Sequence, residues 1–152
     1  MDTPVKKYLF RFALIYVVLL VALAILETFL DKENSMLQML VIMVSGIMVS
    51  DKFTKDNMRT PNKLEKRGLV FGSFALANLI SGILFALIYA LANAEGQKAF
   101  IELLQRIPLP VFSGIIIIVC LLQVLLLSYI YDGMAKKTLE AHQKRTAKEV
   151  AK

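Results

Sequence analysis

The sequence predicts an all-α membrane protein: a four-transmembrane-helix bundle with a short outer interfacial helix and a cytoplasmic C-terminal helical tail. Of the 152 residues, 57% are hydrophobic, and the mean hydropathy is +0.63. The hydrophobic residues come in blocks, and residues 69–94 and 107–131 contain no charged side chain. Uncharged runs of about 18 residues or more are typical of spanning helices, because the hydrocarbon core is about 30 Å thick.

The four spans are expected at about residues 8–30, 36–53, 69–94 and 110–131. Residues 1–131 would then form one transmembrane domain, and residues 132–152 a basic cytoplasmic tail. The charge-free centre of the first span is short, but Arg11 and Glu27 can extend their side chains toward the two interfaces. Because three more hydrophobic blocks follow, we interpret this segment as an uncleaved span and not as a signal peptide.

The second block, Met36–Ser50, is the weakest of the four candidates. Its 15 residues make about 22 Å of helix, which is short for a span. A re-entrant or interfacial helix is the competing interpretation. A full crossing is favoured, because without it the basic residues 51–68 would lie on the outer side of the membrane.

Residues 95–107 have the pattern of an amphipathic helix, which we expect to lie in the outer interface. Pro108 and Pro110 end this segment and start the fourth span. The tail is rich in Ala, Lys and Glu, and we expect a solvated helix that frays toward its end.

The distribution of basic residues predicts that both termini are cytoplasmic. Fifteen of the eighteen Lys and Arg residues lie before residue 12, in residues 51–68 or in the tail. The other three are Lys32, Lys98 and Arg106. Cytoplasmic loops of membrane proteins carry the excess of positive charge, so the alternate loops with fifteen cations are assigned inside. A bacterial inner membrane is the simplest location for such a protein.

Polar groups inside a membrane are functional candidates because an unpaired polar group is costly in lipid. Glu27 is the one acidic residue within the four hydrophobic blocks and lies near the outer boundary of the first span. It is either a coupling carboxylate of a transporter or an interface anchor. As an anchor it would pair with Lys32 or form a hydrogen bond with Asn93, Tyr89 or Gln38, which are expected at similar depth. Asn78 and Gln123 are expected at the same depth, where two amides can hydrogen-bond between helices. Our first interpretation is that they hold the two helices together, and our second is that they line a substrate site.

Two basic segments are candidates for contacts with lipids or with a partner: Lys63, Lys66, Arg67, Lys136 and Lys137. We expect membrane lipids as partners, together with a protein partner or a homo-oligomer, and no nucleic acid. The residues form no recognisable catalytic, cofactor-binding or metal-binding motif, so no enzymatic activity is expected.

The four-span plan resembles that of the small multidrug resistance transporters. Those transporters carry an essential acidic residue deep in the first span and tryptophans that form an aromatic binding cage. Here Glu27 lies near the outer edge and the chain contains no Trp, so the resemblance is architectural only. The chain also resembles the small, uncharacterised four-span proteins of bacterial inner membranes. The spans contain too few polar residues to line a transport pathway, and two basic segments are available for contacts. We therefore expect a non-catalytic interaction protein: an accessory subunit, an assembly factor or an immunity protein. The alternative is a small oligomeric transporter.

Overall fold

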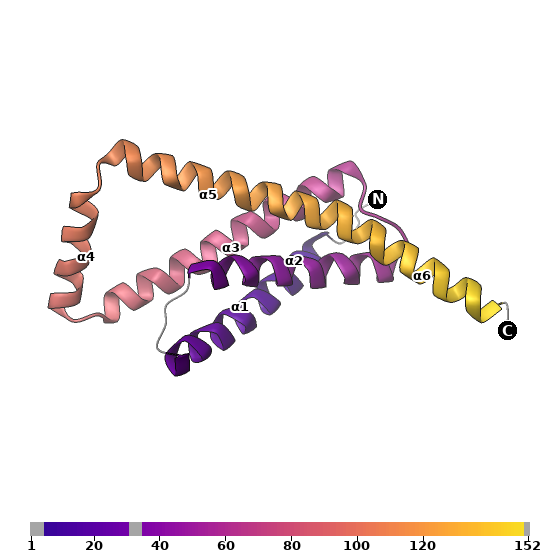
Figure 1. The fold of residues 1–152 in the computed structure, drawn as a ribbon, viewed down its shortest axis with the longest axis horizontal. Coiled ribbons are helices and arrows are strands. Elements are labelled where there is room, and N and C mark those ends of the chain that lie inside the picture. The colour runs from indigo at the N-terminus through magenta and orange to yellow at the C-terminus, as the bar shows by residue number, and fades with distance from the viewer. Residues whose placement is uncertain (1–4, 31–34, 151–152) are drawn as a thin grey trace.

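The computed structural model of the chain describes residues 5–30 and 35–150, and helices account for nearly all of them (Figure 1). Four of these helices are long and apolar enough to cross a membrane, which confirms the predicted class of helical multi-pass membrane proteins. In chain order the elements are α1 (Val5–Leu30), α2 (Ser35–Asn57), α3 (Lys63–Leu91), α4 (Ala94–Arg106), α5 (Leu109–Tyr129), the π-helical segment η1 (Ile130–Met134) and α6 (Ala135–Val150).

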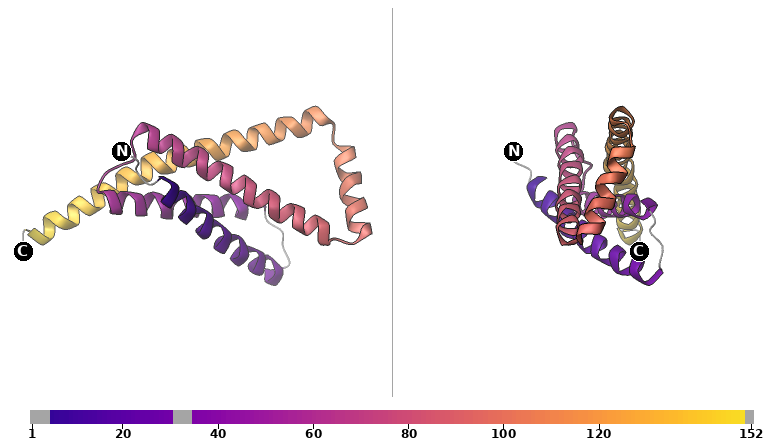
Figure 2. Two further views of the ribbon diagram at one scale, coloured as in Figure 1. Left: turned by 180° about the vertical axis from the view of Figure 1, so that it is seen from behind. Right: turned by 90° about the vertical axis from the view of Figure 1, so that its left-hand side faces the viewer.

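The helices converge at one end of the molecule and spread apart toward the other (Figures 1 and 2). We call the first the basic end, because it holds the Lys- and Arg-rich start of α1, the α2–α3 turn and the junction of α5 with α6. The other is the far end. Helix α1 packs against α2 and α3, α3 packs against α5, and α2 packs against η1 and α6. Helix α4 lies crosswise between the far ends of α3 and α5 (Figure 1).

Helix α2 is the most buried of the four membrane-crossing helices and also has the lowest hydropathy. Its buried hydroxyls are satisfied by main-chain carbonyls: Ser45 donates to Val41 at 2.7 Å, and Thr54 donates to Ser50 at 3.0 Å. Such a helix faces protein more than lipid, so it tolerates polar side chains that an exposed span would exclude. This explains why its hydrophobic block is weak. The helix is nevertheless unbroken over 23 residues, or about 34 Å.

The hydrophobic core is densest at the basic end, where aromatic side chains from three helices meet. Phe12 of α1, Phe53 of α2 and Tyr131 of η1 are at most 1% exposed. The Tyr131 hydroxyl forms a 2.8 Å hydrogen bond with the Ser73 hydroxyl of α3. A buried tyrosine needs such a partner for its hydroxyl, so this contact fixes η1 against α3.

A polar cluster around Asp56 ties α1 to α2 at the basic end. The Asp56 carboxylate accepts hydrogen bonds from the Tyr8 hydroxyl and from Arg11, each at 3.3 Å. It also pairs with Lys52 at 2.9 Å, one helical turn earlier. The Tyr8 hydroxyl in turn accepts a hydrogen bond from the Asn57 amide at 3.0 Å.

The turn between α2 and α3 is held by a two-point ion pair. Arg59 donates to both carboxylate oxygens of Glu65 at 2.7 Å, and the Glu65 side chain is only 5% exposed. This contact raises the pKa of Arg59, because the neighbouring carboxylate stabilises the charged guanidinium. Glu65 and Asn62 also form a capping box, in which each side chain accepts a hydrogen bond from the other residue's backbone N–H.

Helix boundaries differ from the predicted ones at both ends of α3. The capping box starts the helix at Lys63, six residues before the uncharged block begins. The helix ends at Leu91, because the Asn93 side chain accepts a hydrogen bond from the backbone of Gly96 and so starts α4. Residues 95–107 are largely helical as expected, although the position of α4 in the outer interface remains a prediction.

Candidate intramembrane site

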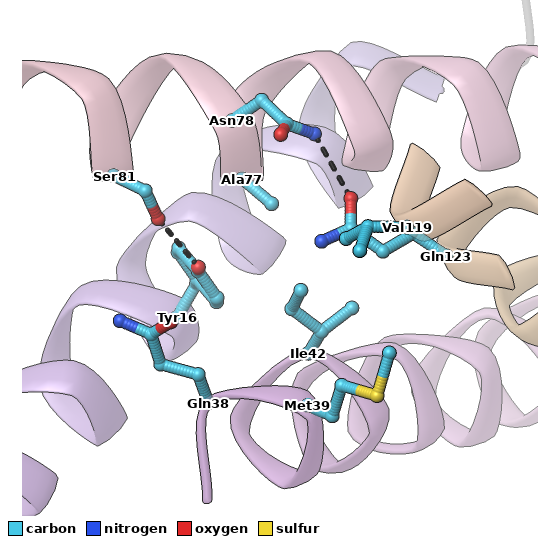
Figure 3. Close-up of a pocket in the computed structure, with 9 residues that line it drawn as sticks. All are labelled: Tyr16, Gln38, Met39, Ile42, Ala77, Asn78, Ser81, Val119 and Gln123. Atoms are coloured by element: carbon cyan, nitrogen blue, oxygen red, sulfur yellow. Dashed lines mark hydrogen bonds between the residues drawn. The ribbon is translucent and has the colours of Figure 1, made fainter. Parts of the chain in front are cut away.

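A cavity of about 480 Å³ is lined by residues of α1, α2, α3 and α5 (Figure 3). Apolar side chains from α2, α3 and α5 form part of its wall. Five residues contribute polar groups: Tyr16, Gln38, Asn78, Ser81 and Gln123. Each of the four membrane-crossing helices contributes at least one of these polar side chains.

Asn78 and Gln123 are brought together across α3 and α5. The Asn78 amide nitrogen donates to the Gln123 side-chain oxygen at 3.2 Å and to the Phe74 carbonyl at 2.8 Å (Figure 3). Asn78 is exposed and Gln123 is half-buried. The amide bridge therefore lies at the rim of the cavity and faces outward between the two helices, and its role stays a prediction.

Tyr16 and Ser81 form a second hydrogen bond on the opposite side of the cavity, between α1 and α3 (Figure 3). Their hydroxyl oxygens are 2.9 Å apart, and Tyr16 is only 2% exposed. Sequence reasoning missed this pair. The need of a buried tyrosine hydroxyl for a partner was the signal that could have pointed to it.

Glu27 lines a neighbouring cavity of about 370 Å³, which shares Gln38 and Ser81 with the first. The carboxylate is half-buried and forms no hydrogen bond or ion pair with another residue that the structure describes. Asn93, one of its expected partners, bonds instead to Gly96, and Lys32 lies outside the described residues. Glu27 and the amide bridge therefore lie in different cavities, and Gln38 and Ser81 line both of them.

The predicted basic residues lie at the basic end, on two different elements. Lys63, Lys66 and Arg67 are on the first turns of α3 and line a cleft toward α5. Asp132 of η1 pairs with Lys66 at 3.2 Å and with Lys136 at 3.3 Å. Lys137 is exposed on α6. Asp132 thus connects the two basic segments, a link that the sequence pattern did not indicate.

The cavity's polar groups are neutral hydrogen-bond donors and acceptors. Within residues 5–30 and 35–150, no group of three or more His, Cys, Asp or Glu side chains could hold a metal ion. Amides and hydroxyls at this depth can bind a polar group of a ligand or of another membrane helix. Helix content, four membrane-crossing helices and this neutral polar cavity define the chain as a helical multi-pass membrane protein. No protein family, curated protein or solved structure matches it.

The amide bridge should contribute measurably to stability. We expect Asn78→Leu and Gln123→Leu each to change the free energy of unfolding, with a coupling energy between them of about 0.6–2 kcal/mol. A double-mutant cycle of reversible unfolding in mixed micelles measures that coupling. Purely additive effects of the two substitutions would contradict the hydrogen bond.

Proposed function

We propose that the chain is a non-catalytic protein of the bacterial inner membrane, with both termini cytoplasmic, that acts through interactions with a protein or with lipids. An accessory subunit, an assembly factor and an immunity protein all fit this description. The observation that carries the proposal is the exposed amide bridge between α3 and α5. It supports a binding role because the paired amides still have unused hydrogen-bonding groups, and unpaired polar groups are costly at this depth.

The amide bridge leaves hydrogen-bonding capacity unused. The Asn78 nitrogen and the Gln123 oxygen are bonded to each other. The Asn78 oxygen and the Gln123 nitrogen have no partner among the described residues. A partner that reaches this rim with its own amide or hydroxyl would satisfy both groups. Water in the cavity would also satisfy them, but it would not cover the surrounding apolar surface.

The apolar surface around the bridge extends along α3 and α5 toward the far end. Phe85 of α3 is 52% exposed and lies seven residues after Asn78, so it shares a helix face with that amide. Ile116 of α5 is 46% exposed and lies seven residues before Gln123, on the same face as that amide. Gly82 lies one turn from Asn78, and a Cβ added there would meet no atom within 4 Å. Small residues allow close helix approach in membranes. The occupant that fits is a transmembrane helix of a partner protein with a polar side chain at the depth of Asn78.

Site-specific photocrosslinking in native membranes tests this proposal. A photoreactive amino acid at Gly82 should give one discrete adduct, which mass spectrometry identifies as a membrane protein. The matched control is Val18 of α1, which is 66% exposed but lies on another helix, and it should give only lipid adducts. Asn78→Leu should weaken the Gly82 adduct. If the chain crosslinks only to itself, the partner is a second copy of the chain. The absence of any protein adduct would overturn the proposal.

The alternative function, a small oligomeric transporter, has one specific observation in its favour. Glu27 and the amide bridge line two neighbouring cavities that share Gln38 and Ser81. If Glu27 couples transport to protons or cations, Glu27→Gln should abolish uptake into proteoliposomes. In an interaction protein the same substitution should leave the Gly82 adduct unchanged, so the two functions are separable.

A further inference from the structure

A basic cleft of about 330 Å³ opens between α3 and α5 at the basic end, away from the intramembrane cavity. Its mouth is cationic and its deeper wall is mainly apolar. It is lined by Lys63, Lys66, Arg67, Val70, Phe71, Val124 and Ser128. The cleft lies where the charged start of α3 gives way to its uncharged block, which is the level expected for phospholipid headgroups.

The three cations of the mouth are not neutralised equally. Lys66 pairs with Asp132, which it shares with Lys136. Lys63 and Arg67 are exposed and have no ion pair with any residue the structure describes. They are four residues apart on one helix, so their side chains lie on the same face. An anion at the mouth would therefore meet two unpaired positive charges.

The wall below the mouth is made of side chains that favour an acyl chain. Phe71 of α3 is 58% exposed, and Val124 of α5 lines the same cleft. A soluble phosphate compound would use the mouth and leave this wall uncovered. A phospholipid would use both parts at once.

We propose that this cleft is a specific site for an acidic phospholipid, with the phosphate held by Lys63 and Arg67 and one acyl chain along Phe71 and Val124. Basic pockets between membrane helices on the cytoplasmic side are known to bind acidic headgroups. The site deepens the lipid part of the proposed function. It does not require the protein partner at the amide bridge, and its test involves no such partner.

Lipid retention in native mass spectrometry tests the site on the full chain. Phosphatidylglycerol should be retained at least tenfold more than phosphatidylcholine of the same chain length. The double variant Lys63→Gln/Arg67→Gln should lower this retention about thirty-fold, the loss expected for two cations near a membrane surface. The charge-conserving pair Lys63→Arg/Arg67→Lys should keep most of it, and circular dichroism checks that each variant remains helical.

The control removes the same charge from the same end of the molecule. Lys6 and Lys7 of α1 are exposed and have no ion pair among the described residues. Lys6→Gln/Lys7→Gln should leave retention within about twofold. Equal losses in both double variants would show a general surface effect and overturn the site. Retention without preference for phosphatidylglycerol would also overturn it, as would equal binding of glycerol phosphate, which lacks acyl chains.

Discussion

Replacing Phe53 with Ala is expected to lower the free energy of unfolding by about 3–5 kcal/mol, the range for a large buried aromatic. The Phe53 ring is 0% exposed, and its centroid lies 4.9 Å from that of Tyr8. The Arg59 guanidinium lies over the same ring, 5.7 Å from its centroid. The substitution therefore leaves a cavity where α1, α2 and the α2–α3 turn meet. Reversible unfolding in mixed micelles, followed by circular dichroism, measures the loss.

Phe10→Ala is the matched control for this measurement. Phe10 is 66% exposed on α1, so its removal should cost about 0.5 kcal/mol or less. Similar losses for the two variants would mean that the aromatic core at the basic end does not determine stability.

Replacing Arg59 with Ala should cost about 2–3 kcal/mol, because a buried carboxylate loses its charged hydrogen-bond donors. Glu65 would retain the backbone N–H of Asn62 but would lose both guanidinium contacts. The additional change Glu65→Gln should recover part of the loss, since it removes the buried charge. The same unfolding assay measures both variants.

Lys55→Ala provides the comparison for an exposed ion pair. Lys55 pairs with Asp51 at 2.6 Å, but both side chains are well exposed. Such pairs within one helix contribute about 0.3–0.5 kcal/mol. If Arg59→Ala costs no more than Lys55→Ala, the turn between α2 and α3 is not held by its ion pair.

The membrane-crossing helices could be predicted because hydropathy depends only on composition along the chain. The uncharged blocks of α3 and α5 are long enough to identify them without any tertiary information. The start of α3 was also predictable in principle, since Asn62 and Glu65 have the spacing of a capping box. The charges up to Arg67 instead suggested a loop. The position of the basic loops on the cytoplasmic side stays a prediction.

The contacts of the candidate site were only partly predictable. Depth along two helices placed Asn78 and Gln123 at the same level, but depth does not determine which faces meet. The bonds between Tyr16 and Ser81 and between Tyr131 and Ser73 depend on the rotation of each helix about its axis. That rotation is set by the packing of all neighbouring helices, which no single span encodes.

The π-helical segment η1 has a mechanical consequence for the tail. Main-chain helix continues from α5 through η1 into α6 without a loop, so residues 109–150 form one rod of roughly 60 Å. Because α6 contacts α2, a movement of α5 away from α3 that kept this rod straight would also shift α6 along α2. A distance label on Lys137 of α6 would then report how far α3 and α5 stand apart.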